Sequence, residues 1–148
     1  MLTRSALAGN ARGKLAAAEA LIREGCWSDA FYLGGYAVEI ALKAIVASRF
    51  RADELPDRKL VESLHTHNLA RLVDIAELGA DLDRRRQEPA FDRHWVVVLS
   101  WSENSRYRLV ERVDAEKLVE ALAHPEHGVF EWLRLHLPEL GSRPGPGS

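Results

Sequence analysis

The sequence predicts an all-α fold, an antiparallel up-down bundle of four to five helices whose last helix is kinked or broken near Pro125. Three observations support this. Residues 31–49 form a run of helical length that is apolar on nearly every face, as expected for a helix in the middle of a bundle. Flanking segments repeat apolar residues at a helical period. Short connections between them favour antiparallel neighbours.

The bulk composition is that of one globular domain. A chain of 148 residues is long enough to bury a core without disulfides or metal. We expect a single domain over residues 1–140, followed by residues 141–148, a Gly- and Pro-rich stretch that reads as a disordered tail or an expression remnant.

Charge and cysteine usage narrow the function classes. The balance of 20 basic and 22 acidic residues gives a formal net charge of -2, so nucleic acid could be bound only through a local patch. Cys26, the only cysteine, leaves no disulfide and no zinc cluster and favours the reducing cytoplasm. The first ten residues lack the apolar core of a signal peptide.

The central run carries one charged pair, Glu39 and Lys43, four residues apart. This spacing puts both on one helix face in the favourable order for an ion pair. The pair also interrupts the run, which is too short for a membrane span. If the two groups are buried, they must be fully hydrogen-bonded or they cost stability.

The N-terminal half predicts further helices. Residues 3–24 are amphipathic and end at Gly25, and Ser28 or Asp29 offers a cap for the central helix. Residues 51–64 read as a loop with at most a turn of helix. A third helix is expected over residues 65–80, with Thr66 or Asn68 as its cap and Gly79 as its stop.

The C-terminal half is more ambiguous. Residues 81–90 read as a charged connector, whose arginines 84–86 fit a solvated surface better than a phosphate site. Residues 91–101 fit a helical face or an alternating strand, and length with helical neighbours decides for helix. Residues 102–112 should be non-helical. Asp114 should cap the next helix, and Pro125 should break it before a segment 129–137 that returns to the core through Trp132 and Leu133.

Motifs for catalysis or cofactors are missing. The sequence contains no phosphate-loop, dinucleotide, zinc-protease or nucleophile-elbow motif, so we expect no cofactor. His65 and His67 lie two residues apart without cysteines or an obvious third ligand, so capping or a turn contact is favoured over a metal.

Arg106, Tyr107 and Arg108 form the most informative polar cluster. Two guanidinium groups around an aromatic ring can hold phosphate while the ring stacks on a base. A structural interpretation stays open beside it, in which Arg106 pairs with a buried acid such as Glu39 and Tyr107 plugs the bundle.

Four segments together resemble the HEPN superfamily. They read GxxxxAxYLGGYAVEIALKA over Gly25 to Ala44, HTHNL from His65 to Leu69, SRY at residues 105–107, and VDAEKLVEAL over residues 113–122. The resemblance implies a bundle of four or more helices that often dimerises and is often encoded beside a small nucleotidyltransferase, as toxin and antitoxin. A subset of the family are metal-independent ribonucleases with an Arg and a His separated by four to six residues.

Carried onto this chain, the resemblance matches Glu39, Lys43, Arg106 and Tyr107 to family-like positions. No His lies four to six residues after Arg106, and Arg58 to His65, the one literal match, spans a predicted loop. The missing His favours a binding protein without strong catalysis.

Three functions follow as hypotheses. The preferred one is a cytoplasmic, dimeric binding partner of a nucleotidyltransferase or of RNA or nucleotide, part of a toxin–antitoxin pair. The alternative is a metal-independent ribonuclease that uses Arg106 with His65 or His67, because such an enzyme needs a base and a cation for the phosphate. The third is a small-ligand-binding bundle with a pocket beside Glu39 and Lys43.

Overall fold

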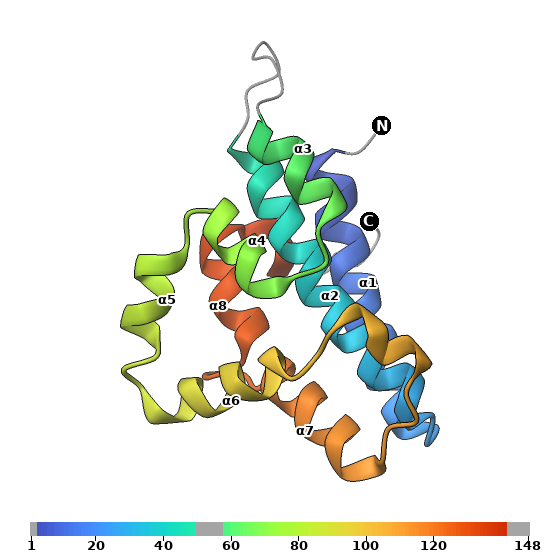
Figure 1. Cartoon of the computed structure of the whole chain (residues 1–148). Coiled ribbons are helices and arrows are strands. Elements are labelled where there is room, and N and C mark those ends of the chain that lie inside the picture. Colours follow the sequence, from blue (N-terminus) through green and yellow to red (C-terminus); the bar gives the residue numbers. More distant parts are fainter. Residues whose placement is uncertain (1–2, 50–57, 142–148) are drawn as a thin grey trace, which may run out of the picture.

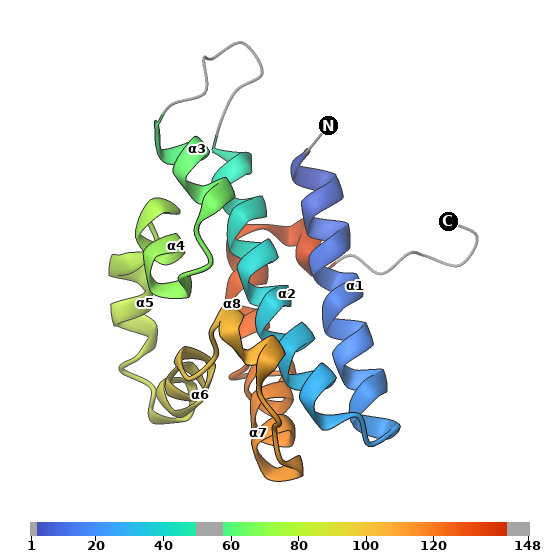
Figure 2. The ribbon, with the colours of Figure 1, turned by 45° about the vertical axis from the view of Figure 1, so that its right-hand side comes forward.

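The computed structural model describes residues 3–49 and 58–141, with the side chains of 59 and 60 left out. Within these residues every regular element is helical, which confirms the all-α prediction. The two longest helices, α1 (Arg4–Arg23) and α2 (Trp27–Ser48), lie side by side and antiparallel (Figures 1 and 2). The other elements are α3 (Arg58–His65), α4 (Leu69–Ile75), α5 (Gly79–Arg85), α6 (Pro89–Leu99), the 3-10 helix η1 (Glu103–Tyr107), α7 (Arg112–Ala123), α8 (Val129–His136) and the 3-10 helix η2 (Pro138–Gly141).

Helix α2 is the centre of the fold, as its composition predicts. It contacts α1, α3, α4, α7, α8 and η1. It is also the one helix in the described residues that is long and apolar enough to cross a membrane, but 72% of that window is buried inside the protein. Packing against its own neighbours therefore accounts for its apolar surface.

The turn between α1 and α2 is set by Gly25. Its φ of 77° lies in the left-handed region, which a glycine adopts without steric cost. The amides of Gly25 and Cys26 donate to the carbonyls of Ile22 and Leu21, which is the Schellman pattern of a helix end. Helix α2 then begins at Trp27 after Cys26, so the expected caps at Ser28 and Asp29 are wrong by two to three residues.

The described residues hold more and shorter helices than the four to five expected. Residues 58–65 form α3 rather than a loop, and residues 51–57 of that prediction fall outside the described part. The single helix expected over residues 65–80 ends at Ile75, because Glu77 turns into the left-handed region with a φ of 60°. Helix α5 then covers part of the expected connector, and Gly79 begins it instead of stopping α4.

The C-terminal predictions hold better, except that residues 103–107 of the segment expected to be non-helical form η1 and that α7 already begins at Arg112. The ambiguous segment is helical as α6, with Phe91, Trp95 and Val98 buried on one face. The chain is broken around Pro125, where α7 ends and α8 begins. Trp132 and Leu133 are buried, as expected. The cap of α7 is Glu111 rather than Asp114, and all but the first residue of the expected tail lie outside the description.

Asp81 ties α5 to α8. One carboxylate oxygen accepts from Arg84 at 2.7 Å, and the other accepts from Trp132 Nε1 at 2.8 Å and contacts His136 Nε2 at 2.7 Å. The hydrogen bond from Arg84, followed by that from Trp132, holds the pKa of the Asp81 carboxyl well below its usual range. A carboxyl whose pKa is lowered by folding stabilises the fold above its unfolded pKa, and that stabilisation is lost as the pH falls.

Asp81→Asn is therefore expected to weaken the fold at neutral pH and to flatten its acid dependence. We expect a loss of about 1 kcal/mol, less than the range of about 1.5 to 3 kcal/mol for hydrogen bonds to charged groups, because the carboxylate is partly in water. Urea unfolding between about pH 2 and pH 7 measures both effects. Asp83→Asn, an exposed acid of the same helix, is the matched control. An unchanged acid profile in Asp81→Asn would contradict this role.

Candidate functional site

His67 lies between two carboxylates. Its Nδ1 is 3.0 Å from both side-chain oxygens of Glu39, and its Nε2 is 3.5 Å from Oε2 of Glu103. Nδ1–H donates to the ionised Glu39, because a carboxylate can only accept. The imidazole is 43% exposed, and its Nε2 faces Glu103 rather than the buried Glu39.

Glu39 is the buried member of this group. Its side chain is only 3% exposed, and Lys43 Nζ donates to its Oε2 at 3.1 Å from one turn further along α2. The expected ion pair of the central run is therefore formed. With His67 on its other side, both carboxylate oxygens have a donor within 3.1 Å, as burial of a charge requires.

Local hydrogen bonds bring His67 to α2. The segment between α3 and α4 is fixed at Thr66, whose Oγ1 accepts from the amide of Asn68. Asn68 caps α4, and its Oδ1 accepts from the amide of Arg71, so the expected cap is confirmed. His67 is held between these two turns.

Trp101 fixes η1 against α2. Its indole is buried against Gly35, and its Nε1 donates to the carbonyl of Tyr32 at 3.1 Å. Ser102 and Ser105 form a capping box at the start of η1. Beyond its end, the amide of Val110 donates to Ser28 Oγ at 2.9 Å. The segment that carries Glu103 and Arg106 is thus attached to α2 on both sides.

The arginines of η1 and the following residues stack on aromatic rings. The Arg106 guanidinium lies 4.6 Å from the centroid of Tyr107 and donates to its hydroxyl, and that hydrogen bond is the main cause that raises the pKa of Arg106. Arg108 lies 5.2 Å from the centroid of Phe31. Both arginines are exposed, and within the described residues neither forms an ion pair with a carboxylate. Arg112, in contrast, pairs with Glu116.

The predicted contact between Glu39 and Arg106 is wrong. Glu39 is paired with Lys43 and His67, whereas Arg106 lies on the solvent side of η1. The alternative in which Tyr107 plugs the bundle is also wrong, since this residue is 74% exposed. The charges of Glu39 and Arg106 both act on Tyr32, whose pKa is raised mainly by burial. Tyr32 therefore lies within electrostatic range of both.

The other predicted candidates, the histidines 65 and 67 and the arginines 84–86, differ in whether they join the site. His65 ends α3 and is exposed, and His67, not His65, joins Glu39. Among the three arginines 84–86, Arg84 and Arg86 pair with acids and Arg85 lies over Phe91. Only Arg84 is exposed as the expected solvated surface requires, whereas Arg85 and Arg86 are half-buried. Glu103 was not predicted from the sequence. The one signal for it is its position in a polar turn, two residues after Trp101.

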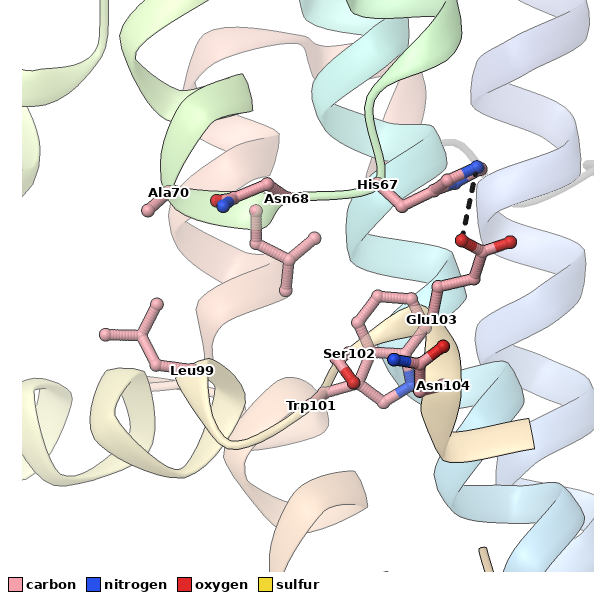
Figure 3. A pocket seen from close by; sticks show the side chains of 9 residues that line it. His67, Asn68, Ala70, Leu99, Trp101, Ser102, Glu103 and Asn104 are labelled. Carbon is pink, nitrogen blue, oxygen red and sulfur yellow. Dashed lines mark ion pairs between the residues drawn. The ribbon is translucent and has the colours of Figure 1, made fainter. Parts of the chain in front are cut away.

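A cleft opens beside His67 between the start of α4 and η1 (Figure 3). Its volume is about 420 Å³. The lining residues are His67, Asn68, Leu69, Ala70, Leu99, Trp101, Ser102, Glu103 and Asn104. Glu39 and Lys43 are not among them, so the pocket expected beside that pair is displaced to its His67 side. We call this feature the α4–η1 cleft.

No metal centre is found in the part of the chain that the structure describes, where no three His, Cys, Asp or Glu residues are arranged to hold an ion. Comparison with protein-family models, curated proteins and solved structures finds no match for this chain. The functional interpretation therefore depends on the site itself and on the motif resemblance.

Proposed function

We propose that this chain is a HEPN-like protein that binds RNA or a nucleotide at the α4–η1 cleft and the adjoining arginines. The up-down arrangement of a HEPN bundle is part of the same proposal. The observation that supports it most is that Arg106 and Arg108 are exposed, lie over aromatic rings and have no carboxylate partner among residues 3–49 and 58–141. Guanidinium groups in this state suit phosphate, and the neighbouring Tyr107 ring can stack on a base.

The electrostatics of the surroundings are compatible with an anionic ligand. The buried Glu39 is compensated by Lys43 and His67, so Glu103 is the acid of this site that faces the ligand side. Because the whole chain is slightly acidic, attraction must come from the local arginines. Binding is then expected to be of moderate strength and sensitive to salt.

Arg106→Ala is expected to weaken binding of a short single-stranded RNA and to lower the slope of log affinity against log salt by about 1. The reason is the loss of one phosphate contact. Fluorescence anisotropy at several salt concentrations measures it. Arg112→Ala is the matched control, because Arg112 is also exposed and also lies over an aromatic ring, that of Trp27, but is already paired with Glu116. Equal losses in the two variants would contradict a specific role for Arg106.

One observation favours ribonuclease activity as a second candidate. The Glu39 carboxylate orients His67 through Nδ1 and leaves Nε2 toward the site, which is the usual arrangement of a general base. His67 would take a proton from a 2′-hydroxyl while Arg106 stabilises the charge on the phosphate. On a denaturing gel, cleavage that His67→Ala abolishes and His65→Ala retains would select this function over binding alone.

The resemblance adds expectations about assembly. It suggests a homodimer and a nucleotidyltransferase partner in a toxin–antitoxin pair. Mass measurement of the purified chain, alone and after co-expression with a neighbouring nucleotidyltransferase, tests both. A monomer under both conditions would argue against them and leave RNA binding to be judged separately.

A further inference from the structure

The α4–η1 cleft has the composition of a site for a flat heterocycle. Leu69 and Trp101 give it apolar surface, whereas Asn68, Ser102 and Asn104 add polar groups. Figure 3 shows Leu99 and Ala70 at one end and His67 with Glu103 at the other. Its volume of about 420 Å³ lies within the range of small-molecule sites, which is about 300 to 1,000 Å³.

A nucleobase fits this pattern better than a purely apolar group does. The faces of a nucleobase are apolar and its edge carries hydrogen-bonding groups, and the cleft is likewise lined by both apolar and polar side chains. The partly exposed imidazole of His67 provides an aromatic surface on which a base can stack. Arg106 follows Glu103 by three residues in η1, so a phosphate attached to that base lies within reach of a guanidinium group.

Glu103 determines which base is favoured. It is the one cleft-lining residue whose ionised side chain only accepts hydrogen bonds. Its Oε2 forms a long ion pair with His67 Nε2 at 3.5 Å, and because a carboxylate oxygen has a second lone pair, both oxygens of Glu103 can still accept from a ligand. Guanine presents two adjacent donors, N1–H and N2–H, which can each donate a hydrogen bond to one oxygen of a carboxylate. Adenine, cytosine and uracil present no such pair.

We propose that the α4–η1 cleft binds one unpaired guanine of an RNA strand, with Glu103 accepting from its N1–H and N2–H and Arg106 holding the adjacent phosphate. This specificity rests on the proposed RNA-binding function. In this proposal the arginines and Glu103 have separate roles. The arginines supply affinity for any strand, and Glu103 selects the base.

The test uses the full chain and four short oligouridylates that differ only in a central G, A, C or U. The strand with G is expected to bind about tenfold more tightly than the others, the discrimination typical of one bidentate pair. Glu103→Gln should remove this preference, because an amide offers one acceptor and one donor. Ala70→Leu, which narrows the cleft, should remove it as well and lower the affinity for the strand with G to that for the other three strands.

Glu120→Gln, an exposed acid of α7 that does not line the cleft, is the matched control and should keep the preference. Equal affinity of the wild-type chain for all four strands would overturn the guanine proposal and leave RNA binding intact. A preference that persists in both Glu103→Gln and Ala70→Leu would also overturn it. Failure of all four strands to bind would overturn the proposed function itself.

Discussion

Glu39→Gln is expected to lower the free energy of unfolding by about 3 kcal/mol, the low end for breaking a buried ion pair from one side. The carboxylate is 3% exposed and its partner Lys43 is only 11% exposed, so the substitution leaves a cation with little water and no counter-charge. It also replaces one of the two oxygens that face His67 Nδ1 with an amide NH2 group, which cannot accept. Urea unfolding followed by tryptophan fluorescence and circular dichroism measures the loss.

Two controls separate this effect from loss of charge in general. Glu62→Gln removes the acid of an exposed pair with Arg71 and should change stability little, because water replaces such a contact. Glu39→Leu combined with Lys43→Met should recover much of the loss, since apolar residues can replace a buried pair. A Glu39→Gln protein as stable as the wild type would contradict the compensated buried charge.

Gly35→Ala is expected to destabilise the chain by about 1 to 3 kcal/mol through overpacking. A Cβ at this position of α2 would lie 2.2 Å from ring atoms of Trp101, including the ring carbon attached to the side-chain stem. The rigid indole cannot yield there without moving the start of η1. The same displacement would disturb the α4–η1 cleft, so weaker RNA binding should accompany the loss of stability.

Gly13→Ala is the matched control for this substitution. Gly13 lies in the interior of α1, where an added Cβ meets nothing within 4 Å. Alanine should stabilise the helix there by about 0.5 to 1 kcal/mol. The two glycine substitutions should therefore have opposite signs in thermal or urea unfolding. A stabilised Gly35→Ala protein would show that Trp101 does not pack against α2 as described.

Elements with a long apolar period could be predicted from the sequence. Helices α1, α2 and α7 repeat apolar residues over several turns. Gly25 and Pro125 mark helix ends because glycine adopts the left-handed conformation and proline lacks the backbone N–H. The break after α4 could not be predicted, because Glu77 adopts a left-handed conformation that sequence assigns to glycine. That conformation places Leu78, which is buried, in the core.

The site was predictable only where its contacts are local. The pair of Glu39 and Lys43 follows from a spacing of four on one helix. Its third member, His67, comes from a turn 28 residues away, and no periodicity relates those two positions. The Arg106 prediction went wrong because burial of Glu39 alone does not say which of several cations reaches it.

The central claim is that ligands enter at the α4–η1 cleft and the arginines of residues 106–108. Amide chemical-shift mapping of the labelled chain during titration with a guanine-containing single-stranded RNA tests it most directly. We expect the perturbed amides to gather at residues 67–70 and 101–108. Perturbation centred instead on the second cleft, which Arg12 and Arg134 line with Leu140, or no perturbation at all, would contradict the account.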